Sequence, residues 1–152
     1  MKTKNLLLAG AAGFGTFMLY KMWSNKKPAT SPKQAIQHWV DTVCKHNPTD
    51  IVNLYAPDGV LLGTVADTIK KGRGQIIEYF NMFVQKKPCG EITSIIEQHD
   101  GNIATVDGTY TFKLTNEEGK VDEVPARFTF VLRNVGGKWL IATHHSSKQP
   151  NI

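Results

Sequence analysis

The spacing of hydrophobic residues changes near residue 88 of the chain. Before it, apolar side chains recur every three or four positions over 32–46, 50–55 and 73–86, which predicts three amphipathic helices. After it, strand-like segments cover 91–99, 103–115, 124–133 and 139–147, separated by short runs rich in Asn, Asp and Gly that are typical of hairpins. A brief apolar strand is predicted over 59–65, around the run Val60-Leu61-Leu62. Helices followed by an antiparallel meander indicate an α+β domain, with a curved sheet wrapped around the helices and a cone-like cavity between them.

The last predicted strand carries the most informative polar residues. Its apolar start, 139–142, runs directly into Thr143, two histidines and two serines. Side chains alternate between the two faces of a strand, so His145 and Ser147 should share the face of the bulky Trp139 and Ile141. We therefore expect His145 and Ser147 to line a pocket with a polar end. The alternative is that the strand leaves the core at Thr143 and the remainder is a solvated tail.

The net charge of +5 is concentrated at the N-terminus. The first 30 residues hold five lysines and no acidic residue; removing these five from the 18 basic residues leaves 13, equal to the number of acidic residues. A neutral domain lacks the basic surface that a phosphate backbone attracts, so we expect no nucleic-acid partner.

The N-terminal segment 1–30 is predicted to be separate from the domain over 31–152. Residues 6–20 are uncharged, slightly short for a bilayer-spanning helix, and followed by Lys21, Met22 and Trp23. A cleaved signal peptide would need a small-x-small site after this core, which the sequence does not offer. We expect an uncleaved membrane anchor, and a periplasmic or secreted protein if the segment is cleaved after all.

Cysteine and histidine spacing gives no metal signature. Cys44 and Cys89 do not form a disulfide framework or a zinc motif, so we expect two free, partly buried thiols. His144 and His145 should point in opposite directions, and His144 should face solvent or a subunit interface. No cofactor is therefore expected, although a metal remains an alternative.

Several motifs together resemble a known family. They are the segments 55–65, 74–80, 126–130 and 137–141 and the ending His144-His145-Ser146-Ser147. They are similar to the branch of the nuclear-transport-factor-2-like cone fold that contains the association domain of calcium/calmodulin-dependent kinase II and the iota-class carbonic anhydrases. The resemblance spans about 33–150. It implies a cone fold, a homodimer, and reversible hydration of CO2 to bicarbonate, in some members without a metal.

The resemblance also implies a set of site residues. Catalytic roles fall on Thr64, Tyr79, His145 and Ser147, with hydroxyls orienting a water and His145 carrying a proton. Arg127 would bind bicarbonate through its guanidinium, or it could pair with Glu123 or Asp107. Apart from the resemblance, Tyr110 is a competing pocket tyrosine, because it shares an apolar strand face with Phe112. The sequence departs from the family pattern at Gly63, where proline is usual, at Thr143, where a first histidine is usual, and at 148–149, where a small residue and a methionine are usual.

Two other functions fit the same cone fold. One is a non-catalytic association or small-ligand-binding domain. The other is an isomerase or dehydratase, which needs a carboxylate base in the pocket. Its candidates are Asp41, Asp67 and Asp107.

Overall fold

The computed structural model describes residues 31–151, so the predicted anchor at 1–30 lies outside the described residues. Helix α2 (Pro32–Val43) begins where the sequence predicts, because Ser31 caps it by accepting a hydrogen bond from the backbone N–H of Gln34. Within 31–151, no helix has the length and apolar character that crossing a bilayer requires.

Two further helices follow, with bounds that differ from the predicted ones. Helix α3 (Pro48–Val52) is capped by the side chain of Asn47, and it ends before Tyr55. Helix α4 (Gly72–Phe83) continues into the short 3-10 helix η1 (Val84–Lys86). The prediction that 53–55 is helical is wrong, because Tyr55 starts a strand.

Six strands form one sheet in the order β2-β1-β6-β5-β4-β3. The strands are β1 (Tyr55–Leu62), β2 (Lys70–Lys71), β3 (Cys89–Asp100), β4 (Ile103–Thr115), β5 (Val121–Val135) and β6 (Lys138–Lys148). The predicted antiparallel meander of β3 to β6 is confirmed. Strand β1 begins and ends earlier than the predicted 59–65, and it pairs with β6 in parallel, which places 55–62 beside the chain's final strand.

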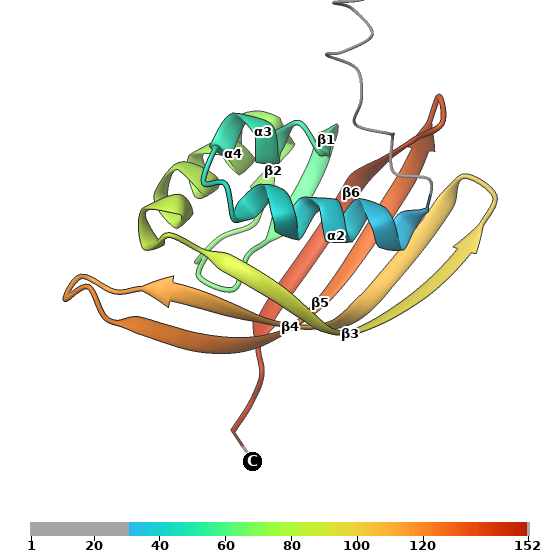
Figure 1. Ribbon diagram of the computed structural model, residues 1–152. Helices are drawn as coiled ribbons and strands as arrows, with labels where there is room; N and C mark the ends of the chain where they lie inside the picture. The colour runs from blue at the N-terminus through green and yellow to red at the C-terminus, as the bar shows by residue number, and fades with distance from the viewer. Residues whose placement is uncertain (1–30, 152) are drawn as a thin grey trace, which may run out of the picture.

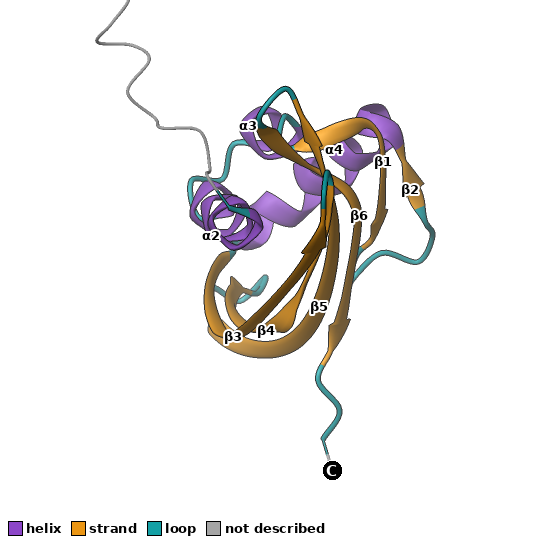
Figure 2. Cartoon of the chain, turned by 90° about the vertical axis from the view of Figure 1, so that its right-hand side faces the viewer, coloured by secondary structure: helices purple, strands orange, loops and turns teal. Residues whose placement is uncertain are grey.

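The sheet is strongly bent, and the helices lie on its concave side. Figure 1 shows α2 crossing above β3 to β6 with α4 beside it, and Figure 2 shows the strands curling around the helices from the side. The predicted α+β layout is therefore correct. The apolar face of α2 contributes Ile36, Trp39 and Val40, all buried, to the core that the sheet encloses.

Two bulges shape the antiparallel part of the sheet. In β3 the register with β4 shifts between Ile92 and Ser94. In β6, Thr143 pairs with Val131 and Ile141 pairs with Leu132, so Ala142 is an extra residue without a partner on β5. A single extra residue reverses which face the following side chains occupy.

The two cysteines form a disulfide, Cys44–Cys89, with Cα atoms 4.3 Å apart. It joins the C-terminal end of α2 to the first residue of β3. The prediction of two free thiols is wrong. Spacing in sequence could not reveal the pair, because the cysteines lie 45 positions apart, with α3, β1, β2, α4 and η1 between them, and only the fold brings them together.

Candidate functional site

A cavity lies between the concave face of the sheet and helices α2 and α4. It offers about 40 Å³ to the centres of water-sized molecules. Most of its wall is apolar, formed by Trp39, Val65, Phe80, Phe83, Phe112, Leu114, Val124 and Ala126. Its polar groups come from Thr64, Tyr79, Tyr110, His144 and Ser146. The cavity is thus a small hydrophobic space with hydroxyls and one imidazole in its wall.

Four of these five polar groups, all but that of Tyr79, form one hydrogen-bonded chain, which Tyr55 extends. The Tyr110 hydroxyl donates to Ser146 Oγ at 2.6 Å, and Ser146 Oγ lies 2.5 Å from Thr64 Oγ1. The Tyr110 oxygen is also 3.4 Å from His144 Nε2, and the Tyr55 hydroxyl is 2.8 Å from His144 Nδ1. The chain therefore connects a deeply buried tyrosine to the hydroxyl of Thr64 in the cavity wall.

Burial keeps these groups neutral. It lowers the pKa of His144 to about 3, with a smaller contribution from the neighbouring His145. Burial raises the pKa of Tyr79 to about 12, an effect that the backbone amide of Val65 opposes. Burial likewise raises the pKa of Tyr110 far above its usual range, against the hydrogen bond to Ser146. At neutral pH the cavity wall thus carries neutral hydrogen-bonding groups and no fixed charge.

The loop after β1 positions Thr64 beside Tyr79. Gly63 packs against the Tyr79 ring so closely that a Cβ at residue 63 would lie 2.7 Å from ring carbons. Glycine at residue 63 therefore leaves room for the tyrosine ring, which a side chain there would displace.

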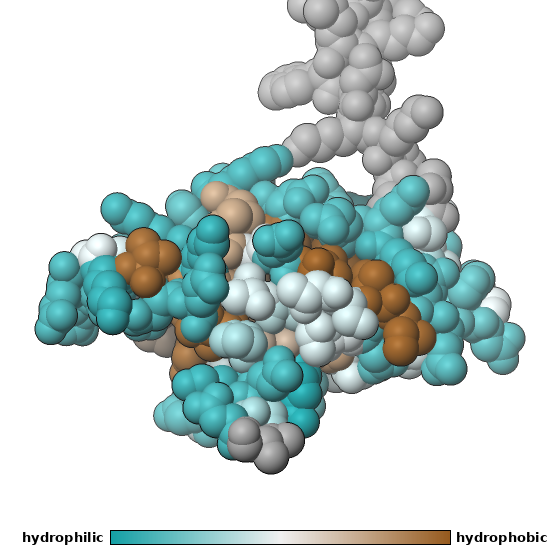
Figure 3. Space-filling view, turned by 60° about the horizontal axis from the view of Figure 1, so that its bottom comes forward, coloured by the Kyte–Doolittle hydropathy of each residue, from teal (hydrophilic) through white to brown (hydrophobic). Residues whose placement is uncertain are grey.

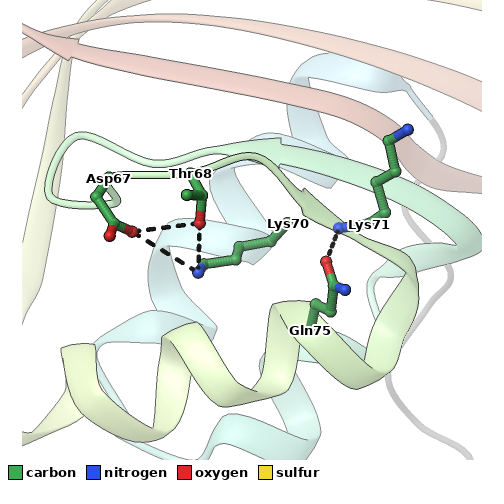
Figure 4. A network of polar contacts seen from close by, with 5 residues as sticks. All are labelled: Asp67, Thr68, Lys70, Lys71 and Gln75. Atoms are coloured by element: carbon green, nitrogen blue, oxygen red, sulfur yellow. Dashed lines mark hydrogen bonds and ion pairs between the residues drawn. The ribbon is translucent and has the colours of Figure 1, made fainter.

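The far end of this loop is fixed to the start of α4 (Figure 4). The Lys70 ammonium donates to Thr68 Oγ1 at 2.9 Å and lies 4.0 Å from the Asp67 carboxylate. The backbone N–H of Lys71 donates to Gln75 Oε1 at 2.9 Å, which secures the first turn of the helix that carries Tyr79.

The structure divides the sequence-predicted site residues into two groups. Thr64 and Tyr79 line the cavity, and so does the competing Tyr110. His145 is exposed and Ser147 half-buried, and neither lines the cavity. The expectation that these two face the pocket is wrong, because the bulge at Ala142 shifts the alternation by one residue.

The same bulge turns His144 and Ser146 inward. His144 is 2 % exposed and Ser146 8 %, so the expectation that His144 faces solvent or a partner is wrong. The ring of His144 stacks on Phe130 at a centroid distance of 3.9 Å. Sequence reasoning also missed Tyr55, whose only signal was its place before the Ala56-Pro57-Asp58-Gly59 run of the family motif.

Arg127 lies on the outer face of the sheet, away from the cavity. It is exposed and pairs in register with Thr109 on one side and Ser147 on the other. Of the ion pairs formed within 31–151, none joins it to Glu123 or Asp107; Asp107 accepts instead from Thr129 at 2.6 Å. The prediction that Arg127 binds a ligand in the cavity is wrong. Figure 3 shows this outer face, where pale and hydrophilic side chains surround smaller hydrophobic groups.

The side chains that line the cavity do not suit a metal ion. Among residues 31–151, no group of three or more His, Cys, Asp or Glu side chains could hold a metal ion. The cavity lining also contains no carboxylate, so Asp41, Asp67 and Asp107 all lie outside it.

A family model, the calcium/calmodulin-dependent protein kinase II association domain, matches residues 33–150. The chain belongs to this family. A solved structure from Xanthomonas campestris, described as such an association domain, is 44% identical with a TM-score of 0.73, covering 77% of this chain and 84% of that one.

More distant structures show the fold alone. A ketosteroid isomerase-like protein from Erwinia carotovora atroseptica is 21% identical with a TM-score of 0.69, covering 84% of this chain and 99% of that one. A nuclear transport factor 2-like superfamily protein from Salmonella enterica serovar Typhimurium is 17% identical with a TM-score of 0.68, covering 78% and 88%. No curated protein matches the chain. This association domain therefore has the NTF2-like cone fold expected from its motifs.

Proposed function

We propose that this association-domain protein is an iota-type carbonic anhydrase that hydrates CO2 to bicarbonate in the cavity. The observation that carries the proposal is the chain of neutral hydroxyls and imidazole at one side of a small apolar space. Apolar walls accept the CO2 molecule, and the hydroxyls bind the oxygens that become negative as bicarbonate forms.

The size of the cavity supports a small substrate. One water needs roughly 10–15 Å³ of such space, so about 40 Å³ holds around three water-sized groups. This is enough for CO2 and one attacking water. A larger substrate of the kind that an isomerase handles would require the walls to open, and the lining offers no carboxylate to act as its base.

The proposed reaction forms one C–O bond between a water oxygen and the CO2 carbon. One C=O bond becomes a single bond whose oxygen takes the negative charge, and the water releases one proton. His144 does not carry that proton at neutral pH, because its pKa is about 3. The proton passes through the cavity mouth to solvent buffer, so we expect a modest rate that rises with buffer concentration. The role in proton transfer that the resemblance gave to His145 stays an untested prediction.

Adjacent serines provide a matched test of the site. We expect Ser146→Ala, which interrupts the chain between Tyr110 and Thr64, to lower kcat/KM about tenfold or more. Ser147→Ala, which removes the same hydroxyl on the outer side, should change it less than about twofold. The measurement is stopped-flow CO2 hydration by the full-length chain, with and without chelator. A rate no higher than buffer alone rejects the proposal, and equal losses in both variants reject the cavity as its site.

The family match favours a second function, a non-catalytic association domain. The mass of the full-length protein in solution separates the two. A homodimer, which we propose, accompanies the enzymatic function, whereas a large closed ring with no hydration activity would favour assembly.

A further inference from the structure

Tyr55 makes the innermost contact of the hydrogen-bonded chain but does not line the cavity. It is fully buried at the start of β1, and its hydroxyl lies 2.8 Å from His144 Nδ1. Arg73 holds its backbone, since Nε and Nη2 donate to the Tyr55 carbonyl at 3.0 and 2.7 Å. Within 31–151 the Tyr55 hydroxyl has no other hydrogen-bond acceptor than this nitrogen.

The contacts of Tyr110 determine which group donates and which accepts in each hydrogen bond of the chain. Tyr110 has one proton, and it donates that proton to Ser146 at 2.6 Å. Its oxygen lies 3.4 Å from His144 Nε2 and has no further proton to give, so a hydrogen bond between these two atoms is one that Nε2 donates. A neutral imidazole carries only one proton, so Nδ1 is the acceptor that Tyr55 requires. The reverse direction would leave the Tyr55 proton buried without an acceptor, which disfavours that state about tenfold or more.

The remaining protons can then be counted. Ser146 accepts from Tyr110, and one proton is shared between Ser146 and Thr64. The two hydroxyl groups carry two protons in total, and only one of them lies between the two oxygens. The other proton can be donated into the cavity, which both residues line. With the chain reversed, every proton would point toward Tyr55, and the same end would offer only lone pairs.

We infer that the Tyr55 hydroxyl fixes the polarity of this chain, so that the cavity presents a hydrogen-bond donor and selects ligands that accept. Tyr55 is thus a positioning residue that acts through His144. The inference deepens the proposed function and rests on it for the substrate, because the oxygens of CO2 and bicarbonate accept such a bond. The direction of the chain holds for any small oxygen-bearing ligand.

Trp39 supports the same direction. Its Nε1 is the one buried side-chain polar atom of the described chain that lacks a hydrogen-bond partner. The indole also counteracts part of the rise in pKa that burial causes at Tyr55. Because an indole N–H can only donate, Trp39 does not compete for the phenol proton of Tyr55, which stays available to His144.

The tautomer of His144 tests the inference directly. We expect nitrogen NMR of the full-length, ¹⁵N-histidine-labelled chain at neutral pH to show a protonated Nε2 and an unprotonated Nδ1 for His144. The signal is assigned by its loss in His144→Gln. In Tyr55→Phe the Nδ1 acceptor loses its donor, so the preference for Nε2–H should fall about tenfold. Tyr79→Phe removes a cavity hydroxyl without touching the imidazole and should leave the tautomer unchanged.

Nitrate serves as the ligand probe, since it is planar like bicarbonate and can only accept hydrogen bonds. We expect nitrate, but not chloride at equal ionic strength, to shift the amide signals of Thr64 and Ser146. In Tyr55→Phe the apparent Kd for nitrate should rise about twofold or more, because the competent tautomer is less populated.

Four results overturn the inference: an Nδ1–H tautomer in the wild type, no nitrate shifts, an unchanged tautomer in Tyr55→Phe, or an unchanged nitrate Kd in that variant. If Tyr55→Phe does not fold, the tautomer and the nitrate titration of the wild type still decide whether the inference holds. The expected tautomer and nitrate binding without any CO2 hydration would reject the enzymatic proposal alone.

Discussion

Adjacent residues of the same type have opposite environments in β6. His144 and Ser146 face the cavity, while His145 and Ser147 face outward. The chemistry of the ending was therefore visible in the sequence, but its orientation was not. Ala142 decides the orientation, and an alanine in a strand carries no signal that it lacks a partner.

At the residue scale, the buried imidazole makes stability depend on pH. His144 titrates near 3 in the folded state and near 6.5 when unfolded, so below about 6.5 the unfolded state binds the extra proton. Folding stability should therefore be fully present above pH 6.5 and decline as pH falls toward 3, by up to about 1.4 kcal/mol per pH unit. Urea denaturation of the wild type and His144→Gln at pH 7, 6, 5 and 4 measures this. The variant should show a shallower decline, and parallel curves would contradict a buried neutral histidine.

At the scale of elements, hydrophobic periodicity located the helices and strands, but contacts distant in sequence set their ends. The predicted strand 103–115 matches β4, whereas β5 and β6 extend beyond their predicted ends. Strand β1 was predicted to start too late, because its pairing with β6 is a contact between residues more than 80 positions apart. The bend of the sheet was expected in outline, but the bulges that shape it were not.

Gly108 permits the close approach of β4 to β3. A Cβ there would lie 2.1 Å from the Ser94 carbonyl oxygen and 2.7 Å from the Phe128 ring. We expect Gly108→Ala to lower the free energy of unfolding by about 1–3 kcal/mol, as overpacking does. Gly74→Ala is the control, because nothing lies within 4 Å of its Cβ position in α4, and it should raise stability by up to about 1 kcal/mol. Urea denaturation measures both; a neutral Gly108→Ala would show that the strands can separate without cost.

At the scale of the whole molecule, one disulfide links two elements that lie far apart in the sequence. The Cys44–Cys89 disulfide joins α2 to β3, and the loop it closes contains α3, β1 and α4. Structural disulfides persist in oxidising compartments, so we propose that the domain resides in the periplasm or outside the cell, tethered by its N-terminal segment.

Removing the disulfide should destabilise the whole domain. For a loop of 45 residues, the loss of loop-closure entropy predicts about 4 kcal/mol of stabilisation. We expect the double variant Cys44→Ser, Cys89→Ser to lose roughly that amount in urea denaturation. A reductant should destabilise the wild type similarly and leave the double variant unchanged. Equal stability of both proteins without reductant would show that the bond does not form in solution.

The sequence alone determined the class of the domain, the positions of its main helices and strands, and the residue types of its site. Those follow from local periodicity and turn chemistry, which each segment carries by itself. Only the tertiary structure decided which histidine and serine enter the cavity, that Tyr55 reaches His144, and that the two cysteines meet. Each depends on strand register or on contacts between distant segments. In a strand, a register shift of one residue moves a side chain from the inner face of the sheet to the outer face.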